Sequence, residues 1–405
     1  MTVIDKLSNI LKTFYLPPIR SQLNTATVLL DKIRAGSEQV SGQDIVTPLM
    51  FGYSQGIGAR NESDDLPSAR KTLYSQSSTR LKANYGRVQL SGHLIRATRD
   101  DRGSFVRAIG SEIQNMVDGL KQDYNRQCFG LGTGELAEST TGSATGETSM
   151  AVDTSQYMKY DMPVVAYSND GSTYRGNFVV RDLPSDTSFL TSTNTNVISD
   201  DDKWFRGEGE SANSKDKEIM GLRGLVDTTS TLQNISPSGT TSFGQGNSAS
   251  PDPDTINSWW KAAKKDTTAE ALSLDKMQAC FTAVEKKAGN TNLVITTYAL
   301  RDKYATLLES NRRYVNVMEL ESGFRALEYN GQPLVPDKDC PDKHMFFLDT
   351  SVMSFQKKGD WDWMDMDGAI WSRVTNKEAY EATIVLESNL VTGARNRSAV
   401  ITAAT

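Results

Sequence analysis

The sequence predicts an α+β protein of several parts, with one long helix among segments of ribbon and sheet. Three observations predict this class. Apolar residues recur at helical spacing over 104–129, alternate along parts of 51–92, and form short β-rich runs after 150. The chain of 405 residues exceeds one ordinary domain, and its hydrophobic fraction of 38% suffices for real cores. The order of these elements matches neither a doubly wound nor a barrel enzyme fold.

The clearest element is the helix predicted over 104–129. Its apolar positions are Phe105, Ile109, Ile113, Met116, Val117, Leu120, Tyr124 and Phe129. At 1.5 Å per residue this helix is about 39 Å long. Gly103-Ser104 is the expected N-cap and Gly130 the expected stop. The following GLGTGE closes a helix instead of opening one, so its glycines do not predict a phosphate-binding loop.

The N-terminal part offers little core of its own. Residues 1–50 predict two short helices, Val3–Phe14 and Leu23–Ile33, separated by Pro17-Pro18. Residues 51–92 alternate at Thr72, Tyr74, Leu81, Ala83, Tyr85, Val88 and Leu90, which predicts a two-stranded ribbon. An isolated two-stranded ribbon is marginal in water. Both segments are therefore expected to need a partner surface.

The remainder of the chain predicts a β module, an α/β region and a β tail. Runs at Pro163–Tyr167, Asn177–Asp182 and Ser188–Thr191, separated by turns, predict a small β-barrel or sandwich within 150–226. Residues 227–258 are expected to form a low-complexity loop. Helices are predicted over Leu274–Ala288 and Tyr298–Ser310, with a buried strand at 292–297 between them, and β structure resumes at Met345.

Charge is unevenly distributed along the chain. Residues 51–130 hold 12 Lys and Arg against 8 Asp and Glu, a net charge of +4. Residues 131–260 hold 8 against 18, a net charge of −10. Separate copies of one chain would thus carry complementary surfaces. The whole chain has a net charge of −6, which is not typical of a nucleic-acid-binding protein.

Several functional classes are disfavoured by composition. Cys128, Cys280 and Cys340 are far apart and predict neither a disulfide framework nor a zinc site. His93 and His344, the two histidines, lie near no nucleophile motif. No apolar run is long enough to span a membrane, and the N-terminal sequence lacks the apolar core of a signal peptide. The chain is expected to have no catalytic residue, cofactor or metal.

The stretch GDWDWMDMDG, 359–368, tests that expectation because its four acids could bind a metal ion. In an EF-hand register Met364 occupies the fifth position and Trp371 the twelfth, where acids are needed. As β structure, Trp361 and Trp363 on one side and Ile370 and Val374 on the other predict a hairpin, with a turn at Asp367-Gly368. We interpret the stretch as that hairpin. A metal-dependent hydrolase built on Asp360–Asp367 is the alternative from another class.

Four stretches together resemble the major capsid proteins of tailed bacteriophages of the Hong Kong 97 type. They are NYGRVQLSGHLIRATRDDRGSFVRAIGSEIQNMVDGLKQDYNRQCFGLGTG (84–134), EIMGLRGLVD (218–227), RRYVNVMELESGFRALEYNGQPLVPDKDCP (312–341) and GDWDWMDMDG (359–368). They occur in the order of that family and span most of the chain.

The resemblance implies a Hong Kong 97-type capsid fold with a β insertion, and a protein that self-assembles into the icosahedral shell around the double-stranded DNA genome of a phage. Its parts would be an N-terminal arm (1–50), an E-loop (51–92), a peripheral domain containing the long helix (93–149), the β insertion (150–226), an axial domain (227–344) and the C-terminal β part of the peripheral domain (345–405). An encapsulin-like compartment shell is the alternative within the same fold.

The resemblance also implies partners. These are further copies of the chain in pentamers and hexamers, a separate scaffolding protein, a portal, packaged DNA contacted without sequence reading, and in some cases a decoration protein, all in a virion assembled in the host cytoplasm without a membrane. Some family members crosslink an E-loop lysine. Lys71 and Lys82 lie in this E-loop, but neither has the apolar surroundings that activate a lysine, so a non-covalent shell is expected. The basic residues expected to meet a neighbour's carboxylates are Arg60, Arg70, Lys71, Arg80, Lys82 and Arg87.

Overall fold

The computed structural model describes most of the chain. The described residues are 29, 32–35, 42, 44–91, 102–192, 196–241, 255–310, 317–319, 325–365 and 370–402. They fall into two compact units. The first comprises Met1–Lys32, Lys82–Leu222 and Lys357–Ser388; the second comprises Ile33–Leu81, Arg223–Gln356 and Asn389–Thr405. The predicted helix Val3–Phe14 and nearly all of Leu23–Ile33 lie outside the described residues.

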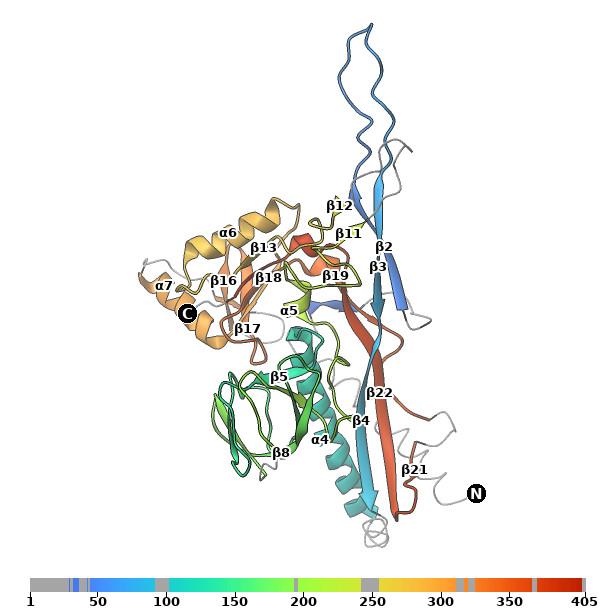
Figure 1. Ribbon diagram of the computed structural model, residues 1–405, viewed down its shortest axis with the longest axis vertical. Helices are drawn as coiled ribbons and strands as arrows, with labels where there is room; N and C mark the ends of the chain where they lie inside the picture. The colour runs from blue at the N-terminus through green and yellow to red at the C-terminus, as the bar shows by residue number, and fades with distance from the viewer. Residues whose placement is uncertain are drawn as a thin grey trace. The chain divides into compact units, whose positions relative to one another are not determined.

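The first unit is built on one long helix and two long strands (Figure 1). Helix α4 spans Arg102–Phe129, which confirms the helix predicted over 104–129. The predicted N-cap, Gly103-Ser104, is wrong because both residues already lie inside the helix. Strand β4, Lys82–Ser91, pairs antiparallel with β22, Ala379–Thr392, in a register that joins Ser91 to Ala379 and Lys82 to Ser388.

Helix α4 lies against β4 and β22 at very short distance. A Cβ added to Gly86 of β4 would lie 2.5 Å from Cδ1 of Leu120, so a larger residue there would require the Leu120 side chain to shift. The Tyr124 hydroxyl hydrogen-bonds with the Ser388 hydroxyl at 2.8 Å, and its ring meets Trp361 edge to face at 6.0 Å. These contacts bury the apolar side of the helix against the sheet.

The predicted hairpin at 361–374 does not form. Strand β20, Asp362–Trp363, and strand β21, Ser372–Arg373, both pair with β22 and not with each other. Trp361 and Trp363 are buried as expected of strand residues. The alternating pattern predicted β structure correctly, but a short-range pattern does not identify the partner strand when a long neighbouring strand is available.

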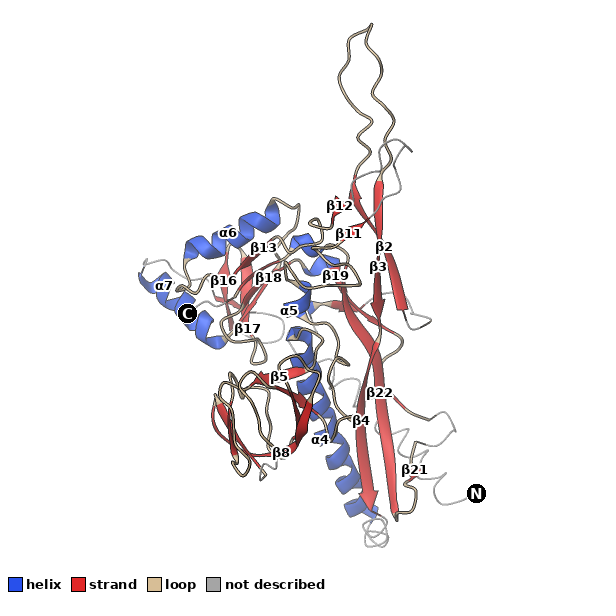
Figure 2. Cartoon of the chain, in the orientation of Figure 1, coloured by secondary structure: helices blue, strands red, loops and turns tan. Residues whose placement is uncertain are grey.

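A closed β-barrel forms the rest of the first unit. Its strands are β5 (Glu135–Glu138), β6 (Ser149–Ala151), β7 (Pro163–Tyr167), β8 (Tyr174–Ser185), β9 (Ser188–Thr191) and β10 (Lys203–Arg206), in the order β5-β10-β7-β8-β9-β6. A bridge between Ser139 and Val152 joins the two ends of this order (Figure 2). Phe178, Phe189 and Trp204 pack edge to face inside it. The expected boundary at residue 150 falls inside the barrel, because β5 pairs with β10.

The second unit contains a ribbon of two strands, β2 (Asp44–Gly52) and β3 (Leu73–Arg80), joined by the loop 53–72. The pairing runs from Asp44 and Arg80 to Gly52 and Leu73. The ribbon expected within 51–92 is therefore shifted toward the N-terminus. The alternation after Leu81 belongs to β4, whose partner is the distant strand β22.

A seven-stranded mixed sheet forms the core of the second unit. Its order is β13 (Lys264–Asp266), β23 (Ala399–Ile401), β18 (Met345–Leu348), β14 (Leu293–Thr296), β17 (Gln332–Pro336), β16 (Arg325–Tyr329) and β15 (Val317–Glu319). Strand β14 confirms the strand predicted at 292–297. The expected boundary after residue 344 divides this sheet, because β18 pairs with β14 and β23 pairs with β18.

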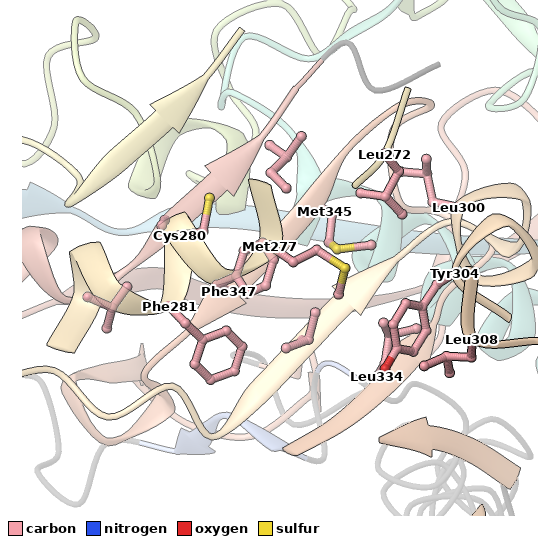
Figure 3. Packing of buried hydrophobic residues seen from close by; sticks show 14 residues of the cluster. Leu272, Met277, Cys280, Phe281, Leu300, Tyr304, Leu308, Leu334, Met345 and Phe347 are labelled. Atoms are coloured by element: carbon pink, nitrogen blue, oxygen red, sulfur yellow. The ribbon is translucent and has the colours of Figure 1, made fainter. Parts of the chain in front are cut away.

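Helices α6, Leu274–Glu285, and α7, Tyr298–Ser310, share one apolar cluster with this sheet. Figure 3 shows Met277 and Phe281 of α6 beside Phe347, with Tyr304 and Leu308 of α7 near Leu334. Both predicted helices are confirmed. Helix α6 ends at Glu285, before the predicted Ala288, which takes a left-handed φ of 57°.

Shorter elements complete the described chain. They are β1 (Arg34–Ala35), parallel to β19 (Met353–Lys357); helix α5 (Leu222–Leu225); the pair β11 (Thr240–Thr241) and β12 (Thr255–Ile256); and the 3-10 turns η1 (Thr350–Val352) and η2 (Arg395–Arg397). The loop expected over 227–258 is in part well packed, since Leu232 and Ile235 are buried. Its residues 242–254 lie outside the described part.

The end of α4 gives a stability prediction. A Cβ on Gly221 would lie 2.5 Å from the Gln127 carbonyl oxygen and 2.6 Å from the Cys128 carbonyl oxygen, and a backbone contact cannot move aside as a side chain can. We expect Gly221→Ala to destabilise the chain by about 2 kcal/mol or more in thermal unfolding. Gly119→Ala is the matched control, because nothing lies within 4 Å of its added Cβ. Gly119→Ala should leave the stability unchanged or raise it. An equal loss of unfolding free energy in the two variants would contradict this account.

Candidate assembly surface

One face of the ribbon exposes apolar side chains. Met50 and Tyr74 lie opposite each other in the β2–β3 register and are 51% and 60% exposed, and Val46, on the same face as Met50, is 57% exposed. We call Val46, Met50 and Tyr74 the apolar stripe. The other face is different, because Leu49, Ser77 and Thr79 are buried. A two-stranded ribbon has no interior, so the chain itself leaves this stripe in water.

The loop 53–72 continues this exposure beyond the strands. Tyr53, Ile57 and Leu66 are 75%, 78% and 85% exposed. Single exposed apolar residues are ordinary on protein surfaces, but a contiguous group on a projecting ribbon indicates a binding surface. Sequence reasoning missed the stripe because β2 precedes the expected E-loop boundary at residue 51. The apolar residues of IVTPLM (45–50) could have indicated a strand there, but not which of its side chains are exposed.

Four of the six expected basic residues lie on the ribbon or its loop. Arg60, Arg70, Lys71 and Arg80 are all exposed there. The Arg60 guanidinium donates hydrogen bonds to the carbonyls of Asp65 (3.1 Å) and Ala59 (2.9 Å), which fixes its position within the loop. The ribbon thus combines apolar and cationic side chains on one projecting element.

The other two basic residues have partners within their own chain. Lys82 and Arg87 lie on β4, outside the ribbon. The Lys82 ammonium donates to the Asp216 carbonyl at 2.7 Å, and Arg87 forms an ion pair with Glu381 on the paired strand β22. The structure therefore places these two on β4 and the other four on the ribbon or its loop.

Acidic side chains of the barrel surround a shallow hollow of about 530 Å³, lined by Ser168, Asn169, Asp170, Thr173, Arg175, Ser199, Asp200 and Asp202. Hydrogen bonds from Ser168 and Ser172 lower the pKa of Asp170 to about 2. Asp202 is buried and lies 3.2 Å from Arg175. The acidic residues expected in this segment thus form part of the barrel surface, and local hydrogen bonds hold several of their carboxylates in place.

A buried charge cluster joins the barrel to α4 within the first unit. Arg126 of α4 pairs with Asp123 at 3.2 Å and with Glu218 at 2.5 Å, and Arg206 of β10 pairs with Asp123 at 3.1 Å. Burial alone would raise the pKa of Asp123, but Arg126 and Arg206 outweigh it and hold the pKa at about 2. Burial raises the pKa of Glu218. Asp123 is therefore the carboxylate that this cluster stabilises in its charged form.

One histidine and all three cysteines lie among the described residues. His344 is half-buried, and loss of solvation lowers its pKa to about 4; its Nδ1 lies 2.7 Å from the Asp342 carbonyl oxygen. Cys128, Cys280 and Cys340 are buried, and burial raises the pKa of Cys280 to about 12. His93 lies outside the described residues. Within the described ranges, no three His, Cys, Asp or Glu side chains are grouped as metal ligands.

The acids of 360–367 are dispersed in the described structure. The Asp360 carboxylate accepts a hydrogen bond from the Lys357 ammonium at 2.5 Å. Asp362 lies on β20, and its carboxylate accepts a hydrogen bond from the backbone N–H of Trp363. Asp367 is outside the described part. In the part of the chain that the structure describes, no helix is long and apolar enough to cross a membrane.

Comparison with solved structures places this architecture in a known class. The chain is similar to the capsid asymmetric unit of cyanophage A-1(L), with a TM-score of 0.52 and 13% identity over 95% of this chain and 93% of that one. The holo-SrpI encapsulin complex of Synechococcus elongatus PCC 7942 gives a TM-score of 0.49 at 8% identity, covering 95% of this chain and 89% of that one. No family model and no curated protein matches the sequence.

The chain has the fold of tailed-phage capsid proteins, the Hong Kong 97 type, as the sequence resemblance predicted. The long helix, the long strand pair, the projecting ribbon and the separate mixed sheet are its parts in this chain. The closed barrel lies between α4 and α5 in the sequence.

The buried charge cluster gives a pH-dependent prediction. Because the pKa of Asp123 is lowered in the folded chain, its contribution is present above the ordinary value of 3.8 and is lost as the pH falls toward 2. Asp123→Asn should cost about 2 kcal/mol of unfolding free energy at pH 7, and this difference from the parent should shrink below pH 3. Thermal unfolding across pH measures it.

Asp161→Asn is the control for this measurement. Asp161 also pairs with an arginine, Arg181, but its side chain is 85% exposed, so its loss should be below about 0.5 kcal/mol at every pH. If Asp123→Asn lowered the unfolding free energy by the same amount at every pH, the charge of the Asp123 carboxylate would not be the source of its contribution to stability.

Proposed function

We propose that the chain is the major shell protein of a tailed phage and that many copies assemble into an icosahedral shell around double-stranded DNA. The observation that carries the proposal is the apolar stripe of Val46, Met50 and Tyr74, exposed on a ribbon that cannot bury it. The fold adds support, because it is shared with a phage capsid subunit. The role requires no catalytic residue, cofactor or metal.

The ribbon is proposed to lie across a neighbouring copy, with its stripe removed from water there. At about 25 cal/mol per Å² of apolar area, such burial supplies a useful free energy at each contact, and a shell repeats that contact many times. Arg60, Arg70, Lys71 and Arg80 would meet carboxylates of the neighbour, for which the acidic surface of the barrel is a suitable chemical partner. Exposed ion pairs contribute only about 0 to 1 kcal/mol each, so burial of the apolar stripe contributes more to the free energy of assembly.

The other partners remain part of this proposal. Copies would form pentamers and hexamers, a separate scaffolding protein would direct their assembly, and a portal and in some cases a decoration protein would join the shell. The DNA would be enclosed without sequence-specific contacts, in keeping with a chain of net charge −6. Assembly would take place in the host cytoplasm, and no lysine crosslink would be needed.

The proposed role of the stripe is tested by substitution. The triple variant Val46→Ser, Met50→Ser, Tyr74→Ser should fold but should form at least about tenfold fewer shells, because it removes apolar area that only a neighbour can bury. Electron microscopy and light scattering measure the yield, and circular dichroism checks the fold. The double variant Tyr160→Ser, Val197→Ser is the matched control, since both residues are exposed apolar residues of the barrel segment (68% and 58%). Normal shells from the triple variant would refute the role of the stripe.

The charge component is tested separately. Arg70→Glu with Lys71→Glu should reduce assembly most at low salt and progressively less as salt screens the repulsion. Substitution of Arg87 should affect the stability of the β4–β22 pair instead, because its partner is Glu381 of the same chain. An assembly yield of the double variant equal to that of the parent at all salt concentrations would show that these charges do not contribute to assembly.

Purified shells that contain protein cargo and no DNA would favour the compartment alternative.

A further inference from the structure

The register of the ribbon determines which backbone groups face outward. In an antiparallel pair of strands, residue pairs that exchange backbone hydrogen bonds alternate with pairs whose N–H and C=O groups point away from each other. The Ser78 N–H donates to the Gln233 carbonyl oxygen at 2.9 Å, so the pair of Val46 and Ser78 is of the second kind. Pro48 and Gln76, two residues further along, are therefore also of the second kind. The backbone nitrogen of Pro48 thus lies on the outer edge of β2.

The two outer edges of the ribbon are closed in different ways. On β3, Ser78 has the Gln233 carbonyl as its partner, and the Arg80 carbonyl oxygen accepts a hydrogen bond from Nδ2 of Asn389 at 2.8 Å. The second unit itself therefore occupies the base of this edge. Among the described residues, no strand pairs with the outer edge of β2. The feature that closes this edge is Pro48, which has no N–H to donate.

The sequence of β2 would otherwise favour pairing with a further strand. It reads DIVTPLMFG, in which isoleucine, valine, threonine and phenylalanine are typical of strands and Asp44 is the single charged residue. Exposed strand edges with apolar side chains and little charge pair readily with strands of other molecules. Lysine, which protects many such edges, is absent from β2. Pro48 stands exposed at the middle of the strand, where it interrupts the edge most effectively.

We propose that Pro48 prevents the outer edge of β2 from pairing with β2 of a second copy, so that the ribbon meets other copies through its side chains. Two β2 strands that paired across their outer edges would join two ribbons into one four-stranded sheet. Pro48 leaves each strand of such a sheet without one donor, and its ring fills the space of the missing N–H. Because the base of the β3 edge is already occupied, the product would be a closed pair of copies and not a fibre.

Pro48→Thr tests this proposal, because threonine suits an exposed strand position and restores the N–H. In the full, unassembled chain, this variant should associate as its concentration rises, toward about twice the mass of the parent in analytical ultracentrifugation. Hydrogen–deuterium exchange of the Val46 amide, read at single-residue resolution, should slow at least about tenfold in the associated form, since this N–H then bonds to the second copy. Pro48→Ala restores the same N–H and replaces Pro48→Thr if that variant does not fold.

Gln76→Thr is the matched control. Gln76 lies opposite Pro48, is exposed as well and already has an N–H, so the substitution introduces the same side chain without a new donor. It should change neither the mass nor the exchange rate of the Val46 amide. The proposal is overturned if Pro48→Thr keeps the mass of the parent, if it associates without protecting the Val46 amide, or if Gln76→Thr associates as strongly.

The consequence of Pro48 for shell formation rests on the proposed function, because edge pairing would divert copies from the shell. The mass and exchange measurements use the unassembled chain and do not depend on that function. The proposed function and the role of Pro48 can therefore fail separately.

Discussion

A ribbon of two strands has two faces and no interior, and this constraint governs the most unusual part of the molecule. One face of β2 and β3 is buried through Leu49, Ser77 and Thr79, and the other leaves Val46, Met50 and Tyr74 in water. The described barrel and mixed sheet, in contrast, each have an apolar interior. The barrel closes on itself through Ser139 and Val152, and the mixed sheet buries its side chains against α6 and α7. The exposed stripe is therefore a property of one element, and its explanation lies in a partner surface.

The sequence predicted elements with strong local periodicity better than it predicted their partners. The α4 helix and the strands β7 and β9 lie where the spacing of apolar residues placed them. The pairing of β4 with β22 was not predictable in the same way. Alternation in 82–91 identifies a strand, but its partner at 379–388 is almost 300 residues away, and nothing in a local pattern encodes that distance. The same reason explains why the expected hairpin at 361–374 is instead two strands on β22.

The candidate surface shows a related limit. Basic residues are easy to see in a sequence, and six of them were expected to meet a neighbour. The structure places Arg60, Arg70, Lys71 and Arg80 on the ribbon or its loop, whereas Lys82 and Arg87 lie on β4. The apolar stripe is not visible in the sequence alone, because exposure and not residue type marks it. Likewise, the outward position of the Pro48 nitrogen depends on the strand register, which composition does not reveal.

The central claim is that assembly removes the apolar stripe from water, and oxidation of Met50 measures this most directly. Met50 is 51% exposed in the single chain, so a mild oxidant should convert it readily to the sulfoxide in unassembled protein. Mass spectrometry of the peptide that contains Met50, before and after assembly, gives the two rates. The account predicts at least about tenfold protection in assembled shells, as expected when oxidation tracks exposure. Equal oxidation of Met50 in shells and in single chains would contradict it.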